Sequence, residues 1–214
     1  LIEVDKDNFL FQNLLGTTLL QLKKYDEAIK HLDISIKLNP NFAESFGNKG
    51  IAHAEKKQYK EAISNYDKAI NLKKSFFDAY LNKGIALKNI HKYNDALKYY
   101  DFCIKVNPRN PKIYSNLGNL FLKQKNFKEA LKFYDKAISL QDGFAEAYYN
   151  RGEANQQLRD YKQAIKDYAK ALKINNNLDY IQGKFLHAKM HICDWGNFDE
   201  QIENLKAGIK NNKK

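Results

Sequence analysis

Cysteine is scarce in this sequence, and long apolar runs are missing from it. The two cysteines, Cys103 and Cys193, cannot form the disulfide framework of a small secreted domain. No stretch approaches the roughly 18 apolar residues of a membrane-spanning helix, and no secretory signal opens the chain. We therefore expect a cytoplasmic protein with no membrane partner. Because the chain does not begin with Met, we also expect it to be a piece of a longer protein.

Arginine is scarce as well, although the chain is basic. The formal net charge is +11, but Arg109, Arg151 and Arg159 are the only arginines among 36 basic residues. The bidentate arginine fork is the usual reader of base edges, and the lysines here are interspersed with Asp and Glu. A uniformly basic surface supports only salt-dependent, non-specific nucleic-acid binding. A nucleic-acid partner is therefore the least favoured of the alternatives.

What the sequence does contain is a repeat with a period of 34. Glycine recurs at this spacing from Gly16 to Gly152, alanine from Ala28 to Ala164, and an aromatic residue from Tyr25 to Tyr161. A fixed period of this length is the signature of a repeat array. We predict one continuous domain over residues 1–176, with repeats at 7–40, 41–74, 75–108, 109–142 and 143–176.

Each repeat is predicted to be a pair of helices joined by a turn. In the repeat 75–108, Ser75 followed by Asp78 matches a capping box that would open the first helix. The second helix should stop before Pro108, because the residue before a proline avoids the α region. Asn110 is then the expected cap of the next helix, with proline at its first position.

The recurring glycine lies inside the first helix of each repeat, where no turn requires it. Glycine in a helix costs about 1 kcal/mol relative to alanine. We attribute its presence to close approach of the second helix, where any Cβ would clash.

These columns resemble the tetratricopeptide (TPR) repeat. The residues that carry the resemblance are Tyr80, Gly84, Ala96, Tyr100, Cys103 and Pro108. The resemblance implies an all-α TPR solenoid, a right-handed superhelix of antiparallel helix pairs, with five full repeats and a degenerate sixth pair. Cys103 stands at the small-residue position of its repeat, so we expect a buried, reduced thiol.

The resemblance also implies where a ligand would bind, because the first helices line the concave side of the TPR fold. An asparagine stands two residues before the glycine in four repeats: Asn48, Asn82, Asn116 and Asn150. Its side chain carries two donors and an acceptor, so a column of asparagines could hold an extended polypeptide by its backbone. We add to this predicted site Asp78, Lys112, Glu146 and Tyr149. Alternatively, the asparagines only tie adjacent helices together.

After residue 176 the register changes. We expect residues 177–214 to form a degenerate sixth helix pair at the junction to a missing C-terminal domain. The spacing from Phe127 to Phe198 is 71 rather than the 68 of two periods, so the first helix or the turn of this pair is longer by three positions. Leu186 replaces the glycine. Terminal repeats of solenoids are expected to be atypical, because they cap an open core.

Two histidines and a cysteine in this segment belong to the types that bind metals. His187, His191 and Cys193 are not completed by a fourth ligand, as a structural zinc site requires. We therefore predict no metal and no cofactor, and interpret His191 and Trp195 as packing residues.

The same segment resembles the junction of the O-GlcNAc transferase family, where TPR repeats meet the glycosyltransferase region. The matching residues are His187, Cys193, Asp194, Trp195, Phe198 and Asp199. The resemblance implies that the chain is the substrate- and partner-binding arm of a larger glycosyltransferase. With no glycine-rich phosphate loop and no activated nucleophile, the chain itself is not expected to be an enzyme. The alternatives are a stand-alone scaffold for a multiprotein assembly and a nucleic-acid-binding solenoid.

Overall fold

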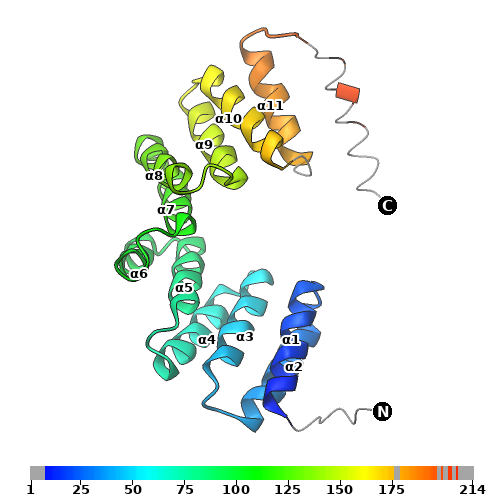
Figure 1. The fold of residues 1–214 in the computed structure, drawn as a ribbon, viewed down its shortest axis with the longest axis vertical. Helices are drawn as coiled ribbons and strands as arrows, with labels where there is room; N and C mark the ends of the chain where they lie inside the picture. The colour runs from blue at the N-terminus through cyan, green and yellow to red at the C-terminus, as the bar shows by residue number, and fades with distance from the viewer. Residues whose placement is uncertain (1–7, 176–178, 197–198, 200–201, 204–205, 207–214) are drawn as a thin grey trace. The chain divides into compact units, whose positions relative to one another are not determined.

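The computed structural model describes residues 8–175, 179–196, 199, 202–203 and 206. Within these residues it has eleven α-helices and no strand, which confirms the predicted all-α fold. The chain divides into two compact units, residues 1–108 and 109–214 (Figure 1). The first unit contains α1 (Phe9–Gln21), α2 (Tyr25–Leu38), α3 (Ala43–Glu55), α4 (Tyr59–Leu72), α5 (Phe77–Asn89) and α6 (Tyr93–Val106). The second contains α7 (Pro111–Lys123), α8 (Phe127–Leu140), α9 (Ala145–Gln157), α10 (Tyr161–Ile174) and α11 (Asp179–His191).

The helices alternate in length, as the repeat requires. Each odd-numbered helix is the 13-residue first helix of a pair, and each even-numbered one is a 14-residue second helix. A single residue in the left-handed backbone region follows each first helix, and these residues recur every 34 positions: Lys23, Lys57, His91, Lys125, Arg159 and Cys193. At Lys57 this conformation lets Gln58 N–H bond to the carbonyl of His53 at 2.8 Å, a hydrogen bond typical of helix C-termini.

The position of Cys193 locates the extra residues of the last repeat. Helix α11 has the usual length, and Cys193 follows Arg159 at the normal spacing of the repeat. The first helix is therefore not the longer element, and the three extra positions fall between Cys193 and Phe198 in the sequence. Phe198 itself and most of the predicted second helix of this pair lie outside the described residues.

In the five full pairs, the core contains a contact between the glycine of the first helix and a side chain of the second. A Cβ added to Gly84 would lie 2.7 Å from Cε1 of Tyr100, and one added to Gly152 would lie 2.7 Å from Cε1 of Tyr168. Both tyrosines are fully buried. In α1 the same place against Gly16 is taken by a leucine side chain. The close approach predicted for the glycine column is confirmed.

One predicted helix start is confirmed and another is wrong. Asn110 caps α7, its side chain accepting a 3.0 Å hydrogen bond from Lys112 N–H, and proline occupies the first turn. Helix α5, however, begins after Phe76, and Ser75 does not cap it. Phe76 packs against Gly47 on the neighbouring helix α3, where an added Cβ would meet its ring at 2.9 Å. The N-cap of α5 is thus Phe76, whose ring packs on the neighbouring helix, and the same register holds at α3 and α9, which begin after Phe42 and Phe144.

Candidate functional site

A small pocket in the first unit lies between the first helices α3 and α5. Three residues of the predicted binding site line it together: Asn48 on α3, and Asp78 and Asn82 on α5. The pocket has a volume of about 150 Å³, and its other lining residues are Gly47, Ile51, Tyr66, Phe76 and Ala79. The structure thus brings part of the predicted site to one place between neighbouring first helices.

The glycine at position 47 shapes this pocket. It immediately precedes Asn48, and its missing side chain leaves room for the ring of Phe76 at the entrance to α5. Ala79, close to the start of the same helix, is buried. Because Asn48 and Asn82 hold equivalent positions on α3 and α5, the 34-residue repeat alone places both amides on this face.

The two amides of this pocket differ in what they already bind. The Asn48 Nδ2 donates to Asn13 Oδ1 at 3.0 Å and to Thr17 Oγ1 at 3.1 Å, both on α1. For Asn48, therefore, the donors tie neighbouring first helices together, as the alternative interpretation held. Asn82 is half-buried, and within the described part of the chain its amide has no hydrogen-bonding partner.

The other predicted site residues lie in the second unit, and their burial and contacts differ from one to the next. Asn116 is half-buried and donates to the Lys112 carbonyl of its own helix at 2.9 Å. Asn150 is half-buried, and the side chains of Lys112 and Glu146 are exposed. The ring of Tyr149 packs against the buried cluster around Tyr168, with ring centroids 6.0 Å apart. The role of these residues in binding stays a prediction.

Ion pairs connect the first helices to the second helices, and one of them is buried. Arg151 on α9 contacts Asp167 on α10 with an Nη2–Oδ1 distance of 2.6 Å, and Asp135 on α8 with an Nη1–Oδ1 distance of 2.7 Å. The Asp167 side chain is only 2% exposed. Lys83 on α5, which is the equivalent of Arg151, pairs with Asp67 in the first unit. Asn150 and Asn82 immediately precede these two cations in the sequence.

A second kind of pocket, which the sequence did not predict, lies at the C-terminal ends of the first helices. Its members contain an aromatic residue that begins a second helix: Tyr25, Tyr59 or Phe127. The pocket between α1 and α3 has a volume of about 370 Å³ and includes Asn48, so it adjoins the predicted site. The 34-residue spacing of the aromatic column was visible in the sequence, but nothing in it showed that space remains beside these rings.

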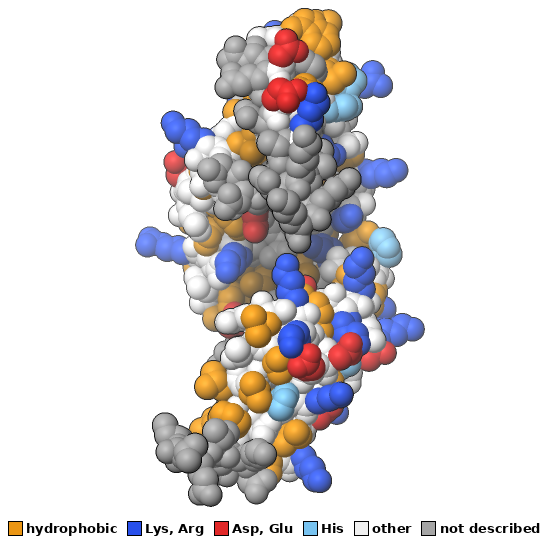
Figure 2. Space-filling model, turned by 90° about the vertical axis from the view of Figure 1, so that its right-hand side faces the viewer, with side chains coloured by type: hydrophobic (Ala, Val, Ile, Leu, Met, Phe, Trp, Pro, Cys, Tyr) orange, Lys and Arg blue, Asp and Glu red, His pale blue; other side chains and the backbone are white. Residues whose placement is uncertain are grey.

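The surface charge and the residues in and after α11 are relevant to the nucleic-acid, packing and membrane predictions made from the sequence. On the face drawn in Figure 2, lysine and arginine side chains are spread out and mixed with acidic ones. His191 is exposed, but its ring stacks on Tyr161 with ring centroids 4.2 Å apart. Trp195 is 56% exposed, so most of its surface is not packed against the described residues. Among the described helices, none is long and apolar enough to cross a membrane.

Comparison with solved structures finds the same fold in other proteins. A chain of the APC/C hetero-tetramer Cut9–Hcn1 superposes with a TM-score of 0.83 at 18% identity, over 97% of this chain and 41% of that chain. The present chain thus spans less than half of that relative. YrrB, described as a TPR protein with an unusual peptide-binding site, gives a TM-score of 0.59 at 22% identity, over 88% and 95% of the two chains. TTC0263 from Thermus thermophilus, a thermophilic TPR protein, gives 0.75 at 19% identity, over 85% and 99%.

Family models identify the repeat directly. Models described as tetratricopeptide repeat match residues 9–42, 77–110, 111–144 and 145–178, and a model described as TPR repeat matches residues 50–90. Curated proteins offer no match to this sequence. With the helix pairs, the glycine–aromatic contacts and the 34-residue period in agreement, the chain belongs to the tetratricopeptide repeat family.

Proposed function

We propose that this chain is a protein-interaction module that binds an extended peptide along its first helices. The observation that carries the proposal is the convergence of Asn48, Asp78 and Asn82 on one pocket between α3 and α5. The free Asn82 amide can donate to a peptide carbonyl and accept from a peptide N–H. Asp78 is exposed and adds a preference for a basic group nearby. One similar structure, YrrB, is described as a TPR protein with a peptide-binding site, which supports this choice.

In the second unit we assign the corresponding contacts to the equivalent positions. Asn116 and Asn150 would bind the peptide backbone, and the exposed side chains of Lys112 and Glu146 would read its charges. Tyr149 would contribute through its partly exposed ring. Backbone contacts of this kind depend little on the ligand sequence, so the flanking charges would add selectivity.

The asparagines provide the test of this proposal. Peptides selected from a phage-displayed random library on the whole chain should bind Asn82→Ala about fivefold more weakly, since one hydrogen bond is worth ~1 kcal/mol. The melting temperature should stay unchanged, because the Asn82 amide has no partner in the described chain. The triple replacement of Asn82, Asn116 and Asn150 by alanine should weaken binding further. Binding that survives all three replacements would contradict the proposal.

Asn48 supplies a matched control from the same column. Its amide bridges to Asn13 and Thr17, so Asn48→Ala should lower the free energy of unfolding by about 1–2 kcal/mol. If Asn82→Ala lost the same stability, its asparagine would be structural as well.

We propose further that the chain is the substrate-binding arm of a larger glycosyltransferase of the O-GlcNAc-transferase type. The support is the asparagine column and the sequence Cys193-Asp194-Trp195, both seen in the sequence alone. A stand-alone scaffold remains the alternative. A sugar-nucleotide-binding domain encoded after residue 214 would support the first, and a stable multiprotein complex recovered without such a domain would favour the second.

A further inference from the structure

Three pockets repeat at the C-terminal ends of the first helices, built from equivalent positions each time. Each contains the last turn of a first helix, the left-handed turn residue, the aromatic residue that begins the second helix, and the last turns of the next first helix. Their volumes are about 370 Å³ at Tyr25, 260 Å³ at Tyr59 and 480 Å³ at Phe127. The pocket at Phe127 lies wholly within the second unit, between α7, α8 and α9.

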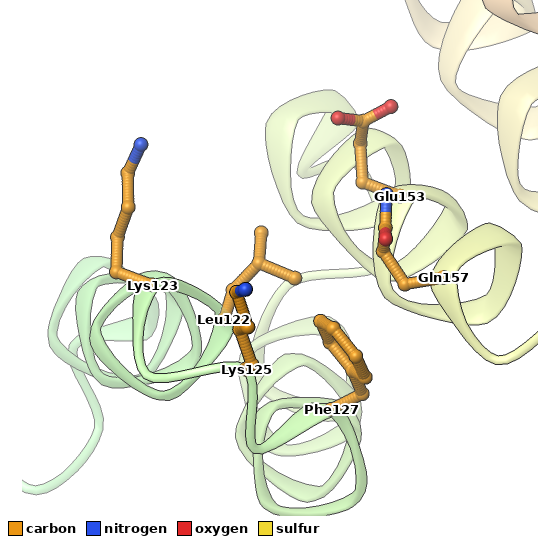
Figure 3. A pocket seen from close by; sticks show the side chains of 6 residues that line it. All are labelled: Leu122, Lys123, Lys125, Phe127, Glu153 and Gln157. Carbon is orange, nitrogen blue, oxygen red and sulfur yellow. The ribbon is translucent and has the colours of Figure 1, made fainter.

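The pocket at Phe127 differs from the other two in chemistry as well as in size. Phenylalanine replaces tyrosine, so no hydroxyl group lies at the ring tip, whereas the Tyr25 hydroxyl donates to Glu55 at 3.3 Å. Lys123 stands where the equivalent residues are Gln21 and Glu55. Figure 3 shows the Phe127 ring between Leu122 and Gln157, with Lys123 and Glu153 on opposite sides.

The charge in this pocket is positive. The Glu153 carboxylate is already paired with Lys184 at 3.0 Å and accepts a hydrogen bond from the Tyr168 hydroxyl at 3.1 Å. Lys123 and Lys125 are exposed, and neither makes an ion pair within the described part of the chain. An incoming carboxylate would therefore meet two unpaired ammonium groups beside an apolar ring.

The next repeat shows what fits over the aromatic residue. Tyr161 is the equivalent of Phe127, and His191 on α11 is the equivalent of Gln157, each one period later. The His191 ring stacks on Tyr161 with centroids 4.2 Å apart and planes 8° apart. His187 packs edge-on against His191, with centroids 4.6 Å apart. A flat ring supplied by the chain thus covers Tyr161, while the place above Phe127 is left open.

We propose that the pocket over Phe127 binds an aromatic side chain of a peptide ligand, with an acidic residue of the same peptide at Lys123 and Lys125. This inference rests on the proposed peptide-binding function and adds a specificity subsite to it. An incoming ring stacks on Phe127 in an offset or edge-on geometry. The carboxylate pairs with the two lysines, and a volume within the roughly 300–1,000 Å³ of specific pockets is enough for both groups. The partner is accordingly a protein with an acidic segment that contains an aromatic residue.

The chain suggests a variant that fills the pocket. Gln157→His would place an imidazole over Phe127 as His191 lies over Tyr161. Asn89→His introduces the same residue at the equivalent position of the pocket at Tyr59 and serves as the matched control. Lys123→Gln removes one ammonium group from the pocket, and Lys128→Gln removes one from an exposed site on α8 outside it.

The experiment selects a phage-displayed random library of short peptides on the whole chain, and measures affinity for the variants by fluorescence anisotropy. We expect enrichment of an aromatic residue next to Asp or Glu. The enriched peptides should bind Gln157→His at least tenfold more weakly than wild type, and Lys123→Gln about threefold more weakly. Their affinity for the controls Asn89→His and Lys128→Gln should not change. A peptide with alanine for its aromatic residue should bind wild type and Gln157→His equally.

The outcomes separate this inference from the function on which it rests. Peptides that lose affinity for Asn150→Ala, in the same unit, but bind Gln157→His normally would overturn the pocket assignment and leave the proposed function standing. Enrichment without aromatic or acidic preference would also overturn it. Failure to enrich any peptide would contradict both. Equal melting temperatures of Gln157→His and wild type are expected, and show that lost affinity reflects the filled pocket.

Discussion

The ring of Tyr100 occupies the space in which a side chain of residue 84 would lie. The ideal Cβ of Gly84 falls 2.7 Å from Tyr100 Cε1, well inside van der Waals contact. Close packing of this kind leaves no room for a larger residue, because protein interiors are filled to the density of organic crystals.

Gly84→Leu should therefore lower the free energy of unfolding by about 1–3 kcal/mol, the usual cost of overfilling a packed contact. Chemical denaturation measures this change. Gly183 gives the control, since its Cβ would meet nothing within 4 Å. Gly183→Ala should stabilise the chain by up to about 1 kcal/mol through helix propensity. Equal effects at the two positions would contradict the packing explanation of the glycine column.

The buried Tyr100 hydroxyl predicts a stabilising substitution. This oxygen is buried without a hydrogen-bonding partner among the described residues, whereas the equivalent hydroxyl of Tyr134 donates to Asn119 Oδ1 at 2.7 Å. An unsatisfied buried polar group costs about 1–3 kcal/mol, so Tyr100→Phe should raise the melting temperature. Tyr134→Phe should lower it, because a partly buried acceptor loses its donor. Destabilisation by Tyr100→Phe would show that its hydroxyl has a partner, such as a water molecule.

Arg151 and Lys83, which occupy equivalent positions of their repeats, should contribute differently to the free energy of unfolding. Arg151→Ala would leave Asp167 as an uncompensated charge on a side chain only 2% exposed, and breaking such a pair costs about 3–5 kcal/mol. Lys83→Ala should cost less, because its partner Asp67 is 47% exposed and can be hydrated. Urea denaturation of both variants measures the difference. Replacing Arg151 together with Asp167→Asn should recover part of the loss.

The two cysteines should react at different rates. Burial and the nearby charge of Asp78 raise the pKa of Cys103 to about 12, and its side chain is fully buried. Cys193 is exposed just after the end of α11. Because the thiolate is the reactive species, a thiol reagent at about neutral pH should label one cysteine in the folded chain and two after denaturation. Rapid labelling of both would contradict the packing of α6.

Buried tyrosines should make the fold sensitive to alkali. Burial raises the pKa of Tyr66, Tyr100, Tyr134 and Tyr168 above the usual 10.0. The folded state therefore keeps them neutral while the unfolded chain ionises, so their contribution is complete below about pH 10 and is lost as the pH rises further. Melting temperatures should fall steeply above that pH. Tyrosinate absorbance should rise together with loss of helicity, and ionisation without unfolding would contradict the prediction.

The sequence was sufficient for the helix pairs because their determinants are local and repeated. The glycine that recurs once in every period predicted the close helix contact, and Asn110 followed by proline predicted the start of α7. The capping box at Ser75 did not predict the start of α5, where the N-cap is Phe76 and its ring packs on Gly47 of the preceding repeat. A pattern of neighbouring residues carries no information about such a contact.

The candidate site was likewise predicted in part from the sequence, and the rest required the structure. Periodicity placed Asn48 and Asn82 on the same face of successive first helices. It could not show that the Asn48 amide donates to residues of α1, whereas the Asn82 amide makes no hydrogen bond within the described chain. The aromatic column was equally visible, yet only the structure shows an open space over Phe127 and a histidine ring over Tyr161. The sequence by itself determined which residues recur at equivalent positions, since spacing is a property of the chain. The tertiary structure decided which of them are already satisfied, because that depends on side chains supplied by neighbouring repeats.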